Sequence, residues 1–315
     1  MIVRVKAPAR LHLGLIDVAG RGPRRFGGLG VALREPVVAV VASPHDELAT
    51  EGPDADRALV FARRCCDALG LPAAGHVRIE QAIPAHVGLG SGTKLALAVG
   101  HALTALHGVA EDSVTLASAS GRAGRSAVGL WTFARGGFVV DGGVRPEVPR
   151  PGALLTRHPM PEHWRCVLAL PRDSGLSGVA EEQAFRRLEP DSDRAAEVTW
   201  IVLRSLLPAL VEQDLIEFGA ALTQVQRLVG EEFASVQGGC FHPRAGELVE
   251  ALLALGAAGA GQSSWGPAAF GLVGCEADGL ELARRLEDEL PGRASVRVLG
   301  FHNGGVRVEA PCVYS

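Results

Sequence analysis

Alternating apolar and polar residues predict strands at the start of the chain. The alternation runs through residues 2–6 and resumes over residues 10–15, where it places Arg10 and His12 on one face and leucines on the other. The leucine face is typical of a core. We therefore expect the face with Arg10 and His12 to look into a polar site.

Apolar periodicity along the rest of the chain predicts a mixture of strands and helices. A proline cluster at residues 146–151 is typical of a linker, and it predicts a boundary between a domain at 1–150 and a domain at 151–315. The predicted strands are 29–41 (a pair broken at Pro36), 76–83, 164–170, 269–273 and 294–299, and the predicted helices are 57–69, 113–120, 195–213, 215–229, 245–255 and 279–290.

A glycine-rich stretch at residues 83–94 joins a predicted strand to an Ala- and Leu-rich helix that ends near Leu106. The first backbone N–H groups of a helix have no partner within it, and the helix dipole places positive charge there. Gly88, Gly90 and Gly92 would let a phosphate approach these groups, so strand, glycine turn and helix together predict an anion site. A loop that only caps a core helix is the alternative.

Donors next to the glycines strengthen the prediction of an anion site. Ser91 and Thr93 add hydroxyl groups, and Lys94 adds an ammonium group. Lys6 and Lys94 are the only lysines in the chain, because arginine supplies nearly all of the positive charge. We therefore expect Lys94 to bind phosphate.

Two other glycine-rich segments carry arginines. The segment at residues 20–28 is interpreted either as a solvated hairpin tip or as a flap that gathers anions. The segment at residues 121–129 suits a polyanion, although isolated loop arginines are more often surface charge. These arginines are Arg21, Arg24 and Arg25 in residues 20–28, and Arg122 and Arg125 in residues 121–129.

Composition indicates a folded protein that binds neither nucleic acid nor membrane. The 315 residues are 47% hydrophobic and 21% charged, with a formal net charge of -4 and no basic excess. The six cysteines lack Cys-x-x-Cys spacing, and neither a signal peptide nor an apolar stretch of membrane length is evident. We expect a cytoplasmic location.

Three motifs resemble those of the superfamily of galactokinase, homoserine kinase, mevalonate kinase and phosphomevalonate kinase (GHMP). They lie at residues 7–11, 84–91 and 259–266. The resemblance implies an α+β fold, with an amino-terminal domain of the ribosomal protein S5 domain 2 type and a carboxy-terminal ferredoxin-like domain. It also implies that the site lies between the two domains.

The chain departs from these kinases where mevalonate-type members carry Pro-Ser-Gly-Val-Asp. Residues 125–129 read Arg-Ser-Ala-Val-Gly, so Gly129 takes the place of the catalytic aspartate. A positioned base contributes about 10²–10⁴-fold to a rate. Its absence disfavours a kinase.

A non-kinase branch fits better. The string Gly-Gln-Ser-Ser-Trp-Gly-Pro at 261–267, together with residues 10–17, 26–30, 88–93 and 125–126, resembles the β-ribofuranosylaminobenzene 5′-phosphate synthase family. That family joins phosphoribosyl pyrophosphate (PRPP) to 4-aminobenzoate and releases pyrophosphate and CO2, towards methanopterin-type cofactors. Lys94 departs from the glutamine expected there.

Alternatives to this function remain. Related synthases of C-nucleoside antibiotic pathways use heteroaromatic carboxylates, so the acceptor is open. An ATP-dependent small-molecule kinase with a relocated base and a catalytically silent nucleotide-binding regulator are the other hypotheses.

The resemblance also implies roles for individual residues, several of which have a structural alternative. A lone histidine is more often a packed residue, a tryptophan is first of all a packing residue, and an isolated acid is more often a cap or turn. Mg²⁺ is expected to bridge the pyrophosphate, and a homodimer is left open. The expected PRPP and phosphate contacts are Gly88, Gly90, Ser91, Gly92, Thr93, Lys94, Arg122, Arg125 and Ser126; the catalytic candidates are His12, His86, Lys94 and Arg125; the acceptor contacts are Arg10, His12, Gln262, Ser263, Ser264 and Trp265; and the weak metal candidates are Asp17, Asp141 and Glu181.

Overall fold

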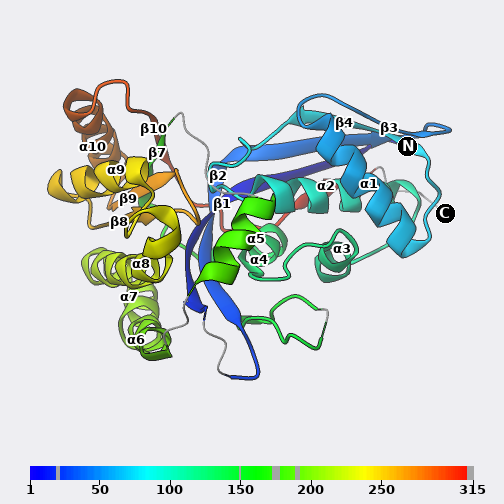
Figure 1. Cartoon of the computed structure of the whole chain (residues 1–315). Helices are drawn as coiled ribbons and strands as arrows, with labels where there is room; N and C mark the ends of the chain where they lie inside the picture. Colours follow the sequence, from blue (N-terminus) through cyan, green and yellow to red (C-terminus); the bar gives the residue numbers. More distant parts are fainter. Residues whose placement is uncertain (19–21, 149, 172–177, 189–191, 311–315) are drawn as a thin grey trace.

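The chain folds into two adjoining units, each built on one β-sheet (Figure 1). The computed structural model describes residues 1–18, 22–148, 150–171, 178–188 and 192–310, without the side chains of 178–182. Within these ranges, no helix combines the length and the apolar character needed to cross a bilayer.

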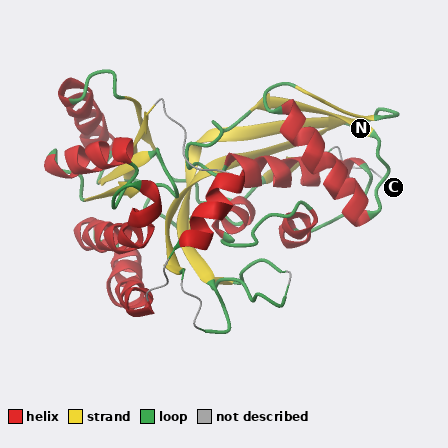
Figure 2. Cartoon of the chain, in the orientation of Figure 1, coloured by secondary structure: helices red, strands yellow, loops and turns green. Residues whose placement is uncertain are grey.

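The first unit contains a seven-stranded sheet with the path β11-β1-β2-β4-β3, in which β5 pairs with β2 and with β6. Helices α1 and α2 lie in front of its strands in the view of Figures 1 and 2. Its elements are β1 (Val3–Asp17), β2 (Phe26–Ser43), β3 (Leu48–Glu51), α1 (Ala55–Leu69), β4 (Gly75–Gln81), α2 (Ser91–Leu106), α3 (Ser113–Ala119), α4 (Val128–Ala134), β5 (Phe138–Asp141), β6 (Leu154–His158) and β11 (Arg307–Glu309).

The second unit contains a four-stranded sheet in the order β10-β7-β9-β8. Its strands and long helices follow one another as β-α-β-β-α-β, which is the ferredoxin-like arrangement that the resemblance implies. Its elements are β7 (Arg165–Pro171), α5 (Gly178–Arg187), α6 (Ser192–Ile201), the π-helical segment η1 (Val202–Leu206), α7 (Leu207–Glu212), α8 (Leu215–Gln237), α9 (Pro243–Ala254), β8 (Gly259–Gln262), β9 (Ala269–Val273), α10 (Glu276–Glu289) and β10 (Ala294–Leu299).

The predicted break at Pro36 does not divide the strand. Residues 26–43 form the single strand β2, which pairs with β1 along most of its length. The interruption instead marks a change of neighbour, because β2 pairs with β5 over Gly28–Val31 and with β4 over Ala39–Ser43. The prediction of two strands at 29–41 was therefore wrong, although its position marks this change.

The predicted domain boundary at residue 150 is also wrong. The proline cluster connects β5 to β6, and β6 pairs with β5 inside the first sheet from His158 to Leu154. The chain crosses to the second unit only after β6, and β11 returns at the end to pair with β1. Proline marks a turn between neighbouring strands as readily as a linker, so composition could not separate the two.

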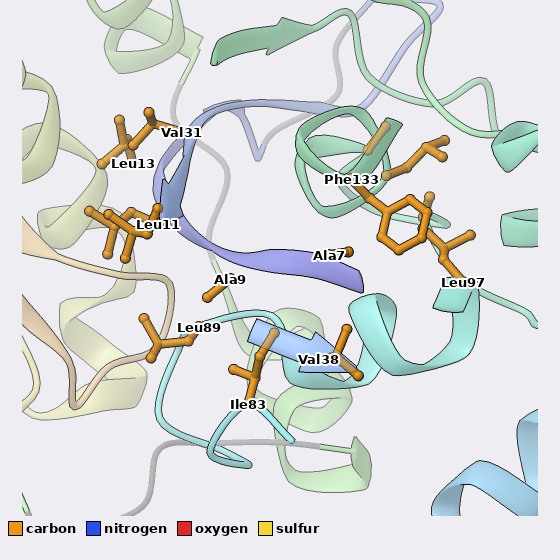
Figure 3. Packing of buried hydrophobic residues seen from close by; sticks show 14 of the residues in the cluster. Ala7, Ala9, Leu11, Leu13, Val31, Val38, Ile83, Leu89, Leu97 and Phe133 are labelled. Atoms are coloured by element: carbon orange, nitrogen blue, oxygen red, sulfur yellow. The ribbon is translucent and has the colours of Figure 1, made fainter. Parts of the chain in front are cut away.

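The core lies where α2 packs on β1 and β2. Figure 3 shows Ala7, Ala9, Leu11 and Leu13 along β1, within a cluster that also contains Phe133 of α4. The cluster continues into the second unit through Phe218, Leu222 and other residues of α8. This continuity joins the two units at β1, the strand that carries Arg10 and His12.

Lys94 is buried in this core, and the sequence does not predict its burial. Its side chain is 0% exposed, and its Nζ donates to Thr132 Oγ1 at 3.0 Å. Nζ also lies 5.7 Å from the centre of the Phe133 ring. Burial first, and then the positive charge of Arg10, hold the pKa of Lys94 well below its usual value.

Replacing Lys94 by methionine is expected to stabilise the protein at neutral pH. Methionine keeps the length of the side chain and removes the cost of burying an amine that is charged in the unfolded chain. We expect the free energy of unfolding in urea to rise by about 1 kcal/mol or more at pH 7. The gain should shrink as the pH rises towards 10.5, where unfolded lysine also loses its proton.

Lys6→Met is the matched control, because Lys6 is the other lysine and is exposed. It should change the free energy of unfolding by less than about 0.5 kcal/mol. A Lys94→Met variant less stable than the native protein at pH 7 would contradict this interpretation of the core.

Candidate anion-binding active site

One cavity of about 900 Å³ lies where the two units meet, and most of the predicted site residues line it. Its walls come from β1, from the glycine loop before α2, from residues 121–126, from α5 and α8, and from residues 264–266. Two motifs that lie far apart in the sequence, the glycine loop and the loop at 262–267, therefore reach the same space. We call the latter the third loop.

The glycine loop ends at the N-terminus of α2, as predicted. Gly88 has φ 87° and Gly90 has φ 79°, both in the left-handed region that favours glycine. The Lys94 N–H donates to the Gly90 carbonyl and is the first amide of α2 bonded in the helical pattern. The amides of Ser91, Gly92 and Thr93 in the first turn therefore have no carbonyl partner within the helix. These three residues line the cavity, so helix N–H groups and two hydroxyl groups are available to an anion.

Ser263 joins the third loop to the glycine loop and to β1. Its Oγ donates to the Gly88 carbonyl at 2.6 Å and accepts the His12 N–H at 2.9 Å. Ser263 is 0% exposed and does not line the cavity. The expectation that it contacts the acceptor is therefore wrong, because the glycine loop and β1 occupy its hydroxyl group.

Gln262 also serves mainly to hold the third loop. Its Nε2 donates to the Ser264 carbonyl at 2.9 Å and to Gln237 Oε1 at 3.2 Å, while its Oε1 accepts the His242 N–H at 2.7 Å. Gln262 and Ser264 both line the cavity. A role for both residues in acceptor binding stays a prediction. For Gln262, such a role would require its side-chain amide to exchange its present hydrogen-bond partners for the acceptor.

Arginine dominates the charge of the cavity. Arg10 is bonded to the Gly88 carbonyl, and the guanidinium of Arg122 lies 5.1 Å from the ring centre of Phe61. The structure does not place Lys94 here, so the phosphate and catalytic roles expected of Lys94 are wrong. The lining arginines are Arg10, Arg25, Arg57, Arg122, Arg125 and Arg186.

Sequence reasoning found some of these arginines and missed others. Arg57 and Arg186 were missed, because neither lies in a glycine motif and only the fold brings them to the cavity. Of the loop at 20–28, Arg25 lines the cavity, whereas Arg24 donates to the Gly143 carbonyl at 3.1 Å. Arg21 lies outside the described residues.

An aromatic wall forms another part of the cavity. Trp265 is 6% exposed, and its ring centre lies 4.5 Å from that of Phe233 and 5.2 Å from that of Phe185. The guanidinium of Arg125 lies 4.6 Å from the Phe185 ring centre. Phe26 also packs against Phe185. Such a wall suits a flat apolar ring, and sequence reasoning proposed only Trp265 for this purpose.

The two predicted histidines differ in environment. His12 is 8% exposed, and burial, followed by the charge of Arg10, lowers its pKa to about 3. Its ring is therefore neutral at physiological pH, and its Nε2 lies 3.0 Å from Ser126 Oγ. His86 is exposed and lines the cavity next to the glycine loop.

Carboxylates are missing from the cavity wall as far as the structure describes it. Gly129 lines the cavity, and a Cβ at this position would lie 3.1 Å from Thr93 Cγ2. Asp17 lines a separate hollow beside Trp200. The part of the wall that the structure describes thus supplies no base of the kind that the kinases place at Gly129.

The carboxylate of Asp141 is used in hydrogen bonds within the protein. Asp141 is 0% exposed, and its carboxylate accepts the N–H groups of Ala127 and Gly143, each at 2.9 Å. It does not line the cavity, so its candidacy as an open metal ligand is wrong. The side chain of Glu181 lies outside the described part of the chain.

The donor set does not fit a Mg²⁺ ion held by the protein. Mg²⁺ prefers carboxylate oxygens and water, whereas the described lining offers guanidinium, amide and hydroxyl groups. Nowhere in the described ranges do three His, Cys, Asp or Glu side chains come together as a metal site requires.

Comparison with known proteins decides the family. The GHMP kinases N terminal domain family matches residues 57–132, and the GHMP kinases C terminal family matches residues 206–292. A beta-ribofuranosylphenol 5'-phosphate synthase of Archaeoglobus fulgidus is 33% identical over 98% of this chain and 100% of the relative. One of the same name from Methanothermobacter thermautotrophicus is 31% identical over 85% of this chain and 88% of the relative. The chain belongs to this synthase family.

The synthase family shares its fold with kinases. Phosphomevalonate kinase of Streptococcus pneumoniae has a TM-score of 0.73 to this chain at 13% identity, covering 96% of this chain and 100% of the kinase. The GHMP fold expected from the motifs is thereby confirmed, as is the resemblance to this synthase family. Since the fold serves kinases as well, the chemistry has to be argued from the cavity.

Gly88→Ala is expected to separate the glycine loop from the third loop. A Cβ at Gly88 would lie 2.2 Å from the Ser263 carbonyl oxygen, which is backbone and cannot move aside alone. We expect a loss of about 1–3 kcal/mol in the free energy of unfolding beyond that of the control. Pyrophosphate affinity, measured by calorimetry, should fall as well.

Gly108→Ala is the control, since Gly108 also has a positive φ of 72° but meets nothing within 4 Å. It isolates backbone strain from the clash. Equal losses of stability in the two variants would show that the contact with Ser263 is unimportant.

Proposed function

We propose that the protein is a PRPP-dependent pentosyltransferase that forms a carbon–carbon bond with loss of CO2. It transfers the 5-phosphoribosyl group to the carboxylate-bearing ring carbon of a benzoate and releases pyrophosphate. The observation that carries the proposal is a cavity lined by six arginines, with no carboxylate among the described lining residues. The names of the relatives, which contain a ribofuranosylphenol 5'-phosphate product, support it.

The cavity suits the departure of pyrophosphate. As the bond between ribose C1 and the pyrophosphate oxygen breaks, C1 becomes positively charged and negative charge grows on the leaving group. Arg10, Arg57 and Arg122 near the first turn of α2 are our candidates to meet that charge. Each hydrogen bond to a charged group is worth about 1.5–3 kcal/mol. Mg²⁺ is proposed to enter with the pyrophosphate of the substrate.

The acceptor step needs no base. The ring carbon that bears the carboxylate attacks C1, the carbon–carboxylate bond then breaks, and its electron pair restores the aromatic ring as CO2 leaves. No proton is removed from the nucleophilic carbon. A glycine at position 129 is compatible with this chemistry, whereas transfer of a phosphoryl group to an alcohol benefits from a base.

The acceptor is proposed to be a benzoate with an electron-donating para group that lies against the aromatic wall. A para amino group gives 4-aminobenzoate, and a para hydroxyl group gives the phenol that the relatives' names contain. Heteroaromatic carboxylates, as in C-nucleoside synthesis, would fit the same wall of Phe185, Phe233 and Trp265. The aromatic wall favours a ring but does not distinguish its substituents.

The decisive experiment measures both products. The protein is incubated with Mg²⁺, PRPP and a carboxyl-labelled acceptor, and labelled CO2 and pyrophosphate should appear in equal amounts. The acceptors are 4-aminobenzoate, 4-hydroxybenzoate and a set of heteroaromatic acids. If neither CO2 nor pyrophosphate were formed with any acceptor, the proposal would be contradicted. Phosphorylation of an alcohol by ATP in a parallel panel would support a kinase instead.

Arg122→Met is expected to lower kcat/KM for PRPP by about 10- to 100-fold, because one charged hydrogen-bond donor is lost. Methionine keeps a long apolar side chain and removes the guanidinium, which lies 5.1 Å from the Phe61 ring centre. Arg63→Met is the control, since Arg63 is exposed on α1 and does not line the cavity. Equal kcat/KM in the two variants would remove Arg122 from the phosphate contacts.

A further inference from the structure

A row of hydrogen bonds leads from the cavity into the first unit. His12 Nε2 lies 3.0 Å from Ser126 Oγ, and Ser126 Oγ donates to Asp141 Oδ2 at 3.2 Å. The Val128 N–H donates to the same Ser126 oxygen at 3.2 Å. His12 and Ser126 line the cavity, whereas Asp141 lies behind them. Neither the transfer step nor the leaving of pyrophosphate, as proposed above, uses this row.

The proton on the His12 ring follows from counting donors and acceptors. A serine hydroxyl carries one hydrogen and can accept two. The carboxylate of Asp141 has no hydrogen, so Ser126 gives its own to Asp141, and Val128 N–H fills one acceptor position. The hydrogen between Ser126 and His12 must then come from His12 Nε2.

This assignment leaves Nδ1 of His12 with a lone pair. No group in the described part of the chain bonds to Nδ1, and the ring lines the cavity. His12 was expected to contact the acceptor, and a contact with the acceptor carboxylate would require a hydrogen-bond donor. A bare Nδ1 can only accept, so it suits an O–H or N–H hydrogen of a substrate instead.

We propose that Ser126 and Asp141 are positioning residues that hold His12 in its Nε2–H form, so that Nδ1 accepts a hydrogen bond from a substrate hydroxyl or amino group. The identity of the substrate rests on the proposed function, but the form of the ring does not. Two sources share this chemistry, the ribose hydroxyls of PRPP and the para group of the aromatic acid.

The surroundings of Asp141 make the arrangement dependent on pH. It faces the amides of Ala127 and Gly143, the hydroxyl of Ser126, and Gly28 of β2, all of them uncharged. Burial raises the pKa of Asp141 to about 6, despite these hydrogen bonds.

His12 itself stays neutral over the range in which Asp141 titrates. The backbone of His12 contacts Gly30 of β2 and Ser263 and Ser264 of the third loop, and its ring contacts the Ser126 hydroxyl; all of these groups are uncharged. The charged residues on the described cavity wall that His12 shares are arginines. Arg10 on the same strand is the charge that acts on it, and it adds to burial in lowering the pKa of His12 to about 3. Between about pH 3 and pH 6 the ring is therefore neutral while Asp141 is protonated.

Protonation of Asp141 should move the proton on His12. A protonated Asp141 donates to Ser126, and Ser126 then turns its own hydrogen towards His12 Nε2. The neutral ring must accept at Nε2, so after exchange with solvent its proton resides on Nδ1. The ring thus changes from an acceptor to a donor towards the cavity without gaining charge.

Nitrogen NMR of the full-length protein with ¹⁵N-labelled histidine tests this directly. The ring signals of His12, assigned by their loss in His12→Gln, are followed from about pH 5 to pH 8. We expect the proton on Nε2 above about pH 6 and on Nδ1 below it, with a neutral ring throughout. A proton on Nδ1 at pH 8, or a ring that becomes charged near pH 6, would overturn the proposal.

Variants separate positioning from general stability. Ser126→Ala should abolish the change near pH 6, because the link to Asp141 is gone. Ser120→Ala is the control, since that hydroxyl is buried and donates to the Leu116 carbonyl rather than to Asp141. It should leave the His12 signals unchanged. If Ser126→Ala behaved like the native protein, Ser126 would not be a positioning residue.

Binding of each substrate alone identifies the group that Nδ1 accepts. Because Ser126 is itself an expected PRPP contact, affinity is measured in His12→Phe, which removes Nδ1. An affinity about five- to tenfold weaker for PRPP points to a ribose hydroxyl, and a similar loss for the aromatic acid points to its para group. Unchanged affinity for both would refute the substrate contact. If no CO2 or pyrophosphate were formed, the proposed function would be contradicted. The NMR experiment would still test the form of the His12 ring, because it does not depend on activity.

Discussion

The hydroxyl group of Ser263 makes the contact on which the cavity depends. It accepts a hydrogen bond from the backbone of β1 and donates one to the glycine loop, so three segments from the two units meet at one oxygen atom. The close approach at Gly88 leaves no room for a side chain. The α2 N-terminus, the strand with Arg10 and His12, and the third loop are thereby held in one arrangement, which is what preorganised charge stabilisation requires.

The groups that face the cavity distinguish this chain from the kinase pattern and underlie the chemistry proposed above. Arginines and helix amides remain for an anion, while the position of the kinase aspartate is a glycine and Asp141 is turned to backbone amides. Positive charge without a base favours the departure of an anionic leaving group over the activation of an alcohol. The aromatic wall around Trp265 adds space for a flat partner.

The sequence predicts those features of the site that depend on residues close together in the chain. The alternation on β1 correctly placed Arg10 and His12 together, and the strand, turn and helix around Gly88 were found as expected. Lys94 was misplaced because successive helix residues differ by about 100° in direction, so Thr93 faces the cavity and Lys94 faces α4. Arg57 and Phe185 depend on how distant elements pack, and no local pattern carries that information.

The return of β11 to the edge of β1 means that the second unit is inserted into the first. Two crossings tether it, one after β6 and one before β11, and Arg34 of β2 is bonded to the Gly300 carbonyl on the return path. A single hinge cannot swing such a unit freely, because both tethers would have to bend together. Losing the last strand would also expose the amides of residues 4–6 as an open edge, which invites pairing between molecules.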